Sequence, residues 1–195
     1  GVAWLVHGDA NLCRAGEIRM PGRHNVSNVL AAVALAHCAG VDEALAIEAA
    51  KIFPGLPHRC EWVGEWNGVS WFNDSKGTNV GATVAALQGL QQTVVLIAGG
   101  QAKGAEFSEL AKAVAGKTRA VVLFGEDASQ IEVAIADRTK VIRADDLAEA
   151  VQEAKSVTQN GDVVLFSPAC ASFDMFDNYL HRGESFVTEV RRIHS

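Results

Sequence analysis

The sequence has little of what marks membrane, secreted and metal-binding proteins. No apolar run reaches the roughly 20 residues that a membrane-spanning helix needs, and no signal-peptide pattern opens the chain. None of the cysteines forms a CxxC pair or stands at metal-ligand spacing from a histidine. We therefore expect a cytoplasmic protein with no membrane segment and no metal site in this chain. We expect the cysteines to be small, buried hydrophobic side chains of a protein in a reducing compartment; they are Cys13, Cys38, Cys60 and Cys170.

The chain also lacks a basic excess. Its formal net charge is −6 over 195 residues, which argues against a nucleic-acid partner because a phosphate-tracking surface needs cations. An anionic small molecule remains compatible, since a cleft can gather a few cations inside an acidic protein. Residues 1–6 have the pattern of a strand from the first residue on, and the sequence has no initiator Met. We therefore expect the chain to be part of a longer protein.

The first part of the chain predicts a small mixed segment. Strands are expected at 2–6 and 17–20, and helices at 26–39 and 42–52, each helix with an apolar face. Pro54-Gly55-Leu56-Pro57 is the strongest breaker cluster in the sequence. We place a domain boundary there, which gives two domains, 1–57 and 58–195.

The second part predicts a doubly wound α/β domain. Asn67-Gly68 between two β-rich runs is a strong hairpin signal. Strands and helices then alternate, and the runs at 94–97, 121–124 and 163–166 are apolar on both faces, as in central parallel strands. The expected fold is therefore α/β, Rossmann-like, with a mainly parallel sheet. Its helices are expected at 107–115, 128–136, 145–158 (capped by Asp145) and 173–193.

Ligands of such folds bind beyond the carboxyl ends of the strands. The loops at those ends span 73–79, 99–104, 125–127 and 167–172. Three of the four hold lysines, hydroxyls or glycines just before a predicted helix, and these groups bind carboxylates and phosphates. The sequence therefore predicts an anion-binding site at this edge of the sheet.

The loop 73–79 carries the strongest local pattern. Lys76 supplies a charge and Thr78 a hydroxyl near the start of a predicted helix, whose free N–H groups favour anions. Asp74 would instead suit ribose hydroxyls or a metal. Taken singly, each residue fits a capped helix with a solvated lysine; the combination favours a site.

Two further loops add weaker patterns. Gly99 and Gly100 let the backbone approach a ligand and Lys103 adds charge, although a tight turn explains them equally well. The small residues after the last strand leave room for a ligand, and Ser172 is expected to donate from the next helix N-terminus. Cys170 has no neighbouring base and is not expected to be a nucleophile. We expect three aromatic side chains at helical spacing to lie in the hydrophobic core: Phe173, Phe176 and Tyr179.

Two remaining candidates are ambiguous on the residues alone. Asn25 and Asn28 share a face near a helix start and could read an adenine edge, but N-capping by Asn25 is the simpler interpretation. Arg59 at the domain boundary could bind a phosphate or sugar, although a surface arginine is the default.

These motifs together resemble the Mur ligase family. The HN..N pattern is shared with related folate ligases, whereas DSKGTN and SPACAS are typical of the glutamate-adding branch. The resemblance covers nearly the whole chain. In order, the matching segments are GRHNVSN, GLPHR, NDSKGTN, IAGGQAKG and SPACASFD.

The resemblance implies a cell-wall ligase that uses ATP and Mg²⁺ to join D-glutamate to UDP-N-acetylmuramoyl-L-alanine through an acyl phosphate. Residues 1–57 would be the tail of the central ATP-binding domain and 58–195 the glutamate-binding domain, in an enzyme that is monomeric when complete. Nucleotide binding is implied for Asn25, Asn28, Arg59 and Asp74. Glutamate binding is implied for Lys76, Thr78, Lys103, Ser172, Phe173 and Tyr179, with Lys76 and Lys103 as catalytic residues. Tyr179 stands where the family usually has phenylalanine.

The departures from the family are also clear. The 195 residues contain no GxxxxGK[ST] loop, and the Mg²⁺ ligands are expected upstream, so we expect the isolated chain to be inactive. A sister Mur or folylpolyglutamate-type ligase is one alternative. A non-catalytic Rossmann-like binding module is the other, and a dehydrogenase is disfavoured because no GxGxxG follows a strand. The sequence does not distinguish D- from L-glutamate.

Overall fold

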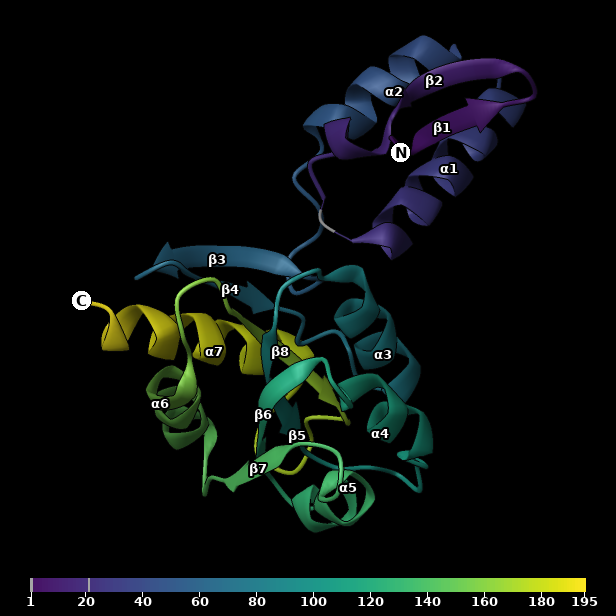
Figure 1. The fold of residues 1–195 in the computed structure, drawn as a ribbon. Coiled ribbons are helices and arrows are strands. Elements are labelled where there is room, and N and C mark those ends of the chain that lie inside the picture. Colours follow the sequence, from purple (N-terminus) through teal and green to yellow (C-terminus); the bar gives the residue numbers. More distant parts are fainter. Residues whose placement is uncertain (1, 21) are drawn as a thin grey trace. The chain divides into compact units, whose positions relative to one another are not determined.

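The computed structural model describes residues 2–20 and 22–195, without the side chains of Arg23 and His24. The chain divides into two compact units, 1–55 and 56–195. Figure 1 shows the elements of both, and each unit is described by itself. None of the helices in the described part has the length and apolarity that spanning a membrane requires.

The first unit packs an antiparallel ribbon against two helices. Its core consists of Leu5, Cys13, Ile18, Val29, Val33 and Ile47. The elements are β1 (Trp4–His7), β2 (Ala10–Arg14), a 3-10 turn (Ala15–Glu17), α1 (Arg23–Cys38) and α2 (Glu43–Ile52).

The predicted strand at 17–20 is wrong. The second strand lies at Ala10–Arg14, because a tight turn at Gly8 (φ 56°) lets the chain pair at once with β1. The Glu17 carboxylate then accepts a hydrogen bond from the Arg14 N–H at 2.9 Å, which holds Ala15–Glu17 in a 3-10 turn.

Both helices of this unit exist as predicted, with shifted starts. Helix α1 begins at Arg23 after Gly22 (φ 98°), so Asn25 lies inside the first turn and the N-cap interpretation is wrong. Helix α2 follows Asp42, whose carboxylate accepts from the Ala44 and Leu45 N–H groups at 2.9 and 3.2 Å.

The second unit is a six-stranded sheet with the strand order β3-β4-β8-β5-β6-β7. The pair β3–β4 is antiparallel and every other pair is parallel, which confirms the predicted Rossmann-like α/β fold. The strands are β3 (Glu61–Trp66), β4 (Val69–Asn73), β5 (Val94–Gly99), β6 (Thr118–Phe124), β7 (Lys140–Arg143) and β8 (Val163–Ala169). The helices are α3 (Val80–Gly89), α4 (Ser108–Val114), α5 (Ala128–Ile135), α6 (Leu147–Val157) and α7 (Tyr179–Ile193).

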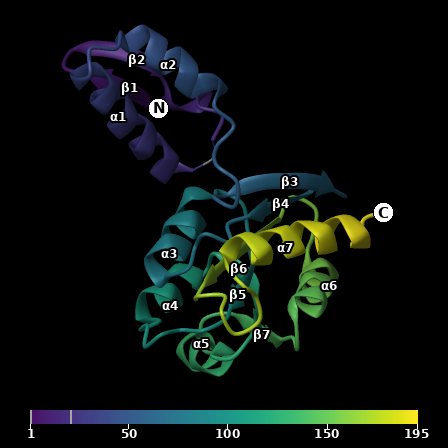
Figure 2. The same ribbon diagram turned by 180° about the vertical axis from the view of Figure 1, so that it is seen from behind.

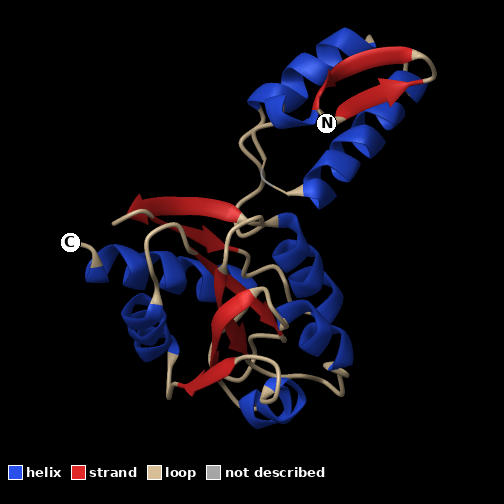
Figure 3. Ribbon diagram, in the orientation of Figure 1, coloured by secondary structure: helices blue, strands red, loops and turns tan. Residues whose placement is uncertain are grey.

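Helices cover both faces of this sheet, as Figures 2 and 3 show. Leu96 and Leu165 point to the core under α3, α4 and α5, whereas Ile97 and Phe166 point to the core under α6 and α7. The central strands are therefore buried on both sides, which explains their continuous apolar runs.

Two helix starts in this unit differ from the prediction. Asp146, not Asp145, caps α6, because its carboxylate accepts from the Glu149 N–H at 2.9 Å. Helix α7 begins at Tyr179 rather than at 173, since the Asn178 side chain accepts from the Leu180 and His181 N–H groups and fixes the start there.

The four cysteines are all free. Cys13 and Cys170 are buried and Cys60 is half-buried, whereas Cys38 is exposed, contrary to the expectation of a buried side chain. Cys38 is the last residue of α1, where the helix leaves the core.

Candidate functional site

The loops after β4, β5, β6 and β8 meet at one edge of the sheet, as the topology predicts. The loop after β5 is bonded to the loop after β8 through Gln101 and Ala171, whose N–H and C=O groups pair at 2.9 and 3.0 Å. The loop after β6 joins them, since Asp127 accepts from the Ala102 N–H at 2.7 Å. The Ala169 N–H donates to the Gly77 carbonyl at 2.9 Å, which attaches the loop after β4.

This close approach of backbones requires glycine at two positions. A Cβ on Gly99 would lie 1.8 Å from the Phe124 carbonyl oxygen, and one on Gly100 would lie 2.3 Å from the Ala171 carbonyl oxygen. Both residues also have positive φ, 135° and 121°. The glycine pair is therefore needed for the loops to meet.

The ammonium group of Lys76 lies over an aromatic ring at this edge of the sheet. Its Nζ lies 3.8 Å from the centroid of the half-buried Tyr179 ring, which is cation–π distance. The preceding Ser75 hydroxyl donates to the Tyr179 carbonyl at 2.8 Å, so the loop after β4 is fixed to the start of α7. Tyr179 therefore serves as a ring partner for the lysine.

Lys103 makes a second pair of the same kind. Its Nζ lies 4.6 Å from the Phe173 ring centroid, and Phe173 is 62 % exposed. The expectation of a core position is wrong for Phe173, because this residue lies in the loop before α7 instead of on the helix. It holds only for Phe176, which is half-buried against the core under α6 and α7.

Neither lysine is ion-paired within the described residues. A face of an aromatic ring orients an ammonium group without neutralising its charge. Lys76 and Lys103 therefore remain able to bind two anionic groups of a ligand, one at each lysine.

The two candidate hydroxyls differ in setting. Thr78 is half-buried and lies just outside α3, which Asn79 caps by accepting from the Ala82 N–H at 3.0 Å. Ser172 is buried, and its carbonyl accepts from the Phe176 N–H at 2.9 Å. Ser172 therefore lies in a turn and not at a helix N-terminus, contrary to the prediction.

Asp74 is a buried carboxyl group, 7 % exposed. Ser167 donates its hydroxyl to one oxygen at 2.6 Å and the Cys60 N–H donates to the other at 3.1 Å. Burial raises the Asp74 pKa to about 6, although these bonds and the charge of Arg59 lower it. Both oxygens are thus engaged within the protein, while Arg59 is exposed.

Asn25 and Asn28 belong to the first unit, whereas all other candidate residues belong to the second. The Asn28 amide donates to the Asn25 side-chain oxygen at 3.3 Å, so the two share one face of α1 as the spacing predicts. Asn28 is exposed and Asn25 is half-buried.

One buried residue was missed by sequence reasoning. Arg182 of α7 is 1 % exposed and donates to the Ser75 and Cys170 carbonyls at 3.0 and 3.1 Å. Burial lowers its pKa to about 10, which leaves the guanidinium charged at neutral pH. A signal was available, because Arg182 precedes the buried Phe186 and Val190 by four and eight residues and so lies on the inward face of the helix.

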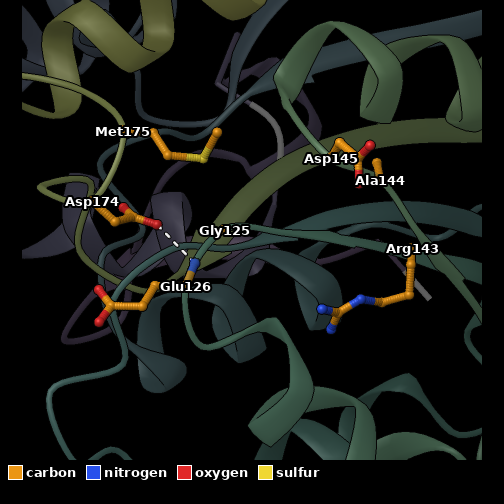
Figure 4. A pocket seen from close by; sticks show the side chains of 7 residues that line it. All are labelled: Gly125, Glu126, Arg143, Ala144, Asp145, Asp174 and Met175. Atoms are coloured by element: carbon orange, nitrogen blue, oxygen red, sulfur yellow. Dashed lines mark hydrogen bonds between the residues drawn. The ribbon is translucent and has the colours of Figure 1, made fainter.

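A separate pocket of about 490 Å³ lies beside the ends of β6 and β7 (Figure 4). It contains one cation, Arg143, and three carboxylates, of which Asp174 accepts from the Glu126 N–H at 3.0 Å. Its lining residues are Gly125, Glu126, Arg143, Ala144, Asp145, Asp174 and Met175, none of which was predicted to bind a ligand. Within the described residues, no three His, Cys, Asp or Glu side chains converge to hold a metal ion.

Known proteins are similar to this chain over nearly its whole length. Residues 58–170 match the family model described as Mur ligase, glutamate ligase domain. The UDP-N-acetylmuramoylalanine–D-glutamate ligase of Nitrosococcus oceani is 50 % identical over 195 residues, covering 99 % of this chain and 43 % of the relative. The enzyme of the same name from Nitrosospira multiformis is 52 % identical over 192 residues, covering 98 % of this chain and 41 % of the relative.

Solved structures share the fold at lower identity. The UDP-N-acetylmuramate-alanine ligase of Thermotoga maritima has a TM-score of 0.64 at 22 % identity, covering 89 % of this chain and 39 % of that one. Folylpolyglutamate synthase of Mycobacterium tuberculosis, complexed with ADP, has a TM-score of 0.64 at 17 % identity, covering 87 % and 41 %. The chain spans about two-fifths of the length of the curated relatives it matches. By its domain match and its fold, the chain belongs to the Mur ligase family.

Proposed function

We propose that the chain is the C-terminal portion of an ATP-dependent ligase that adds D-glutamate to UDP-N-acetylmuramoyl-L-alanine in peptidoglycan synthesis. Relatives of that name, in which about half of the aligned residues are identical, support it. One structural observation carries the proposal. Lys76 and Lys103, which have no ion-pair partner within the described residues, stand at one sheet edge on the loops after the two strands that flank β8, and each is oriented by an aromatic ring.

The two lysines suit the two carboxylates of glutamate. Two separate cations can each bind one carboxylate of a dicarboxylate, and the loops after β4 and β5 supply one cation each. The hydroxyls of Thr78 and Ser172 would add neutral donors between them. Glutamate bound in this way presents its amine in one direction, and the chain contributes to the rate by positioning and by electrostatics.

The reaction needs an activated acyl group, because a carboxylate does not accept an amine at neutral pH. When bound, ATP supplies the phosphoryl group that converts the alanyl carboxylate into an acyl phosphate. The glutamate amine attacks that carbonyl carbon, the C–N bond forms, and the C–O bond to phosphate breaks as inorganic phosphate and a proton leave. The residues of this chain hold the amine donor for that attack.

We also propose that Asn25 and Asn28 contact adenine and that Arg59 and Asp74 contact the sugar and neighbouring groups of the nucleotide. The shared face of the two asparagines supports the first assignment, since side-chain amides match the donors and acceptors of adenine. The Mg²⁺ ligands are proposed to lie upstream of this chain, as the resemblance to the family implies. The complete enzyme is proposed to act as a monomer in the cytoplasm.

The test is phosphate release by the complete enzyme supplied with ATP, Mg²⁺ and UDP-N-acetylmuramoyl-L-alanine. D-glutamate, L-glutamate and no amino acid are run in parallel, and a folate substrate replaces UDP-N-acetylmuramoyl-L-alanine in a further reaction. Release that depends on D-glutamate is expected. Release with L-glutamate alone would change the substrate, and release with a folate substrate alone would point to a folylpolyglutamate-type ligase. No release from a folded enzyme would reject the ligase and leave a non-catalytic binding module.

A further inference from the structure

Arg182 lies under the three loops that carry the proposed glutamate ligands. Its Nη2 and Nε atoms donate to the carbonyl and hydroxyl of Ser75 at 3.0 and 3.2 Å. Its Nη1 donates to the Cys170 carbonyl at 3.1 Å. One planar guanidinium therefore joins the loop after β4 to the loop after β8.

The residues it holds are next to the proposed ligands. Ser75 directly precedes Lys76, and Cys170 stands two positions before Ser172. A Cβ built on Gly100 would lie 3.3 Å from the Arg182 Nη1 atom, so the loop that carries Lys103 also lies close to this group. Arg182 therefore bonds two of the three loops directly and lies beside the third.

The setting of Arg182 is unusual for a charged residue. It is 1 % exposed, and within the described residues its hydrogen bonds go only to neutral oxygen atoms. The Asp174 carboxylate is near enough to raise the pKa of Arg182, but within the described residues it accepts no hydrogen bond from the guanidinium. Burying a charge without a hydrogen-bonded ionic partner is unfavourable, and an apolar side chain at such a site often stabilises a fold better. A purely structural role therefore explains this arginine poorly, whereas a role in loop geometry accounts for its three directed donors.

We infer that Arg182 is a positioning residue for glutamate, which sets the separation of Lys76 from Ser172 and Lys103 by holding the Ser75 and Cys170 carbonyls. This inference rests on the proposed function, because it deepens the same site. Lysine cannot replace the arginine, since a single ammonium does not reach both loops with the geometry of a planar fork.

The experiment measures steady-state kinetics of the complete enzyme with Arg182→Lys and Arg182→Met. Arg191, which is exposed on the same helix, provides the matched controls Arg191→Lys and Arg191→Met. We expect the KM for glutamate to rise about 10-fold or more in both Arg182 variants, as misplacement by about an ångström predicts. The KM for ATP should stay within about 2-fold, and the controls should match the parent enzyme.

A glutamate KM that does not change in folded Arg182 variants would overturn the inference. So would equal rises in the KM values for glutamate and ATP, which would indicate general loosening of the fold. If both variants fail to fold, Ser75→Ala, which removes the hydroxyl that accepts from Arg182 and donates to the Tyr179 carbonyl, must still raise the glutamate KM, or the inference fails. A parent enzyme without glutamate-dependent phosphate release would instead reject the proposed function.

Discussion

Replacing Asp74 by Asn should change the pH dependence of stability in a defined direction. The carboxyl group is 7 % exposed, and burial raises its pKa from 3.8 to about 6. The folded chain therefore keeps a proton on Asp74 at pH values where the unfolded chain has released it. The contribution of Asp74 to the free energy of unfolding is full below about pH 4 and is lost as pH rises through about 6.

The magnitude follows from the shift of about two pKa units, which corresponds to about 3 kcal/mol at 1.36 kcal/mol per unit. Between pH 4 and pH 7.5 we expect the parent chain to lose about 2 kcal/mol or more relative to Asp74→Asn. The asparagine carries no titrating proton, so its own pH profile contains only the other groups. The difference between the two profiles isolates Asp74.

Urea unfolding of the 195-residue chain at a series of pH values supplies the measurement. Tryptophan fluorescence reports mainly on the second unit, because Trp62, Trp66 and Trp71 lie there and only Trp4 lies in the first. Parallel pH profiles for the parent and Asp74→Asn would refute the reasoning, as they would mean that Asp74 titrates at an ordinary pKa in the folded chain.

Three further predictions concern the loops, a buried ion pair and the cysteines. Gly99→Ala should destabilise the second unit by several kcal/mol in urea unfolding, because its Cβ would lie 1.8 Å from the Phe124 carbonyl oxygen, whereas Gly81→Ala, with its nearest atom at 3.5 Å, should be neutral. Arg119→Met should cost about 1–3 kcal/mol, since it leaves the Asp162 carboxylate buried without its bidentate partner; a Tm equal to that of the parent would contradict this. Burial raises the pKa of Cys170 to about 12 and raises that of Cys60 further, so mass spectrometry after alkylation at pH 8 should find the exposed Cys38 modified before either of them.

The sequence predicted the architecture because its signals were local and repeated. Each apolar run at 94–97, 121–124 and 163–166 became a central strand, and Asn67-Gly68 became the hairpin turn. The errors in the predicted helix bounds lie where a capping side chain determines the residue at which a helix begins. Asn178 starts α7 six residues later than the apolar pattern indicated.

The loops of the site were predicted for a similar reason, since the order of strands brings their carboxyl ends together. The partners of the lysines were not predicted, because Tyr179 and Phe173 are distant in sequence from Lys76 and Lys103. Burial of Arg182 depends on carbonyls from two loops that no local pattern connects. Long-range packing therefore determines the part of the site that sequence reasoning missed.

The most direct test of the account compares glutamate KM values for Lys76→Ala and Lys103→Ala in the complete enzyme. Lys112→Ala is the matched control, because Lys112 is an exposed lysine of the same unit whose ion pair, among the described residues, is with Glu109. Loss of a charge-assisted bond to a carboxylate should raise the glutamate KM on the order of 10-fold in each site variant and leave the control unchanged. Site variants that keep the glutamate KM of the parent enzyme would contradict the claim that these two lysines hold glutamate.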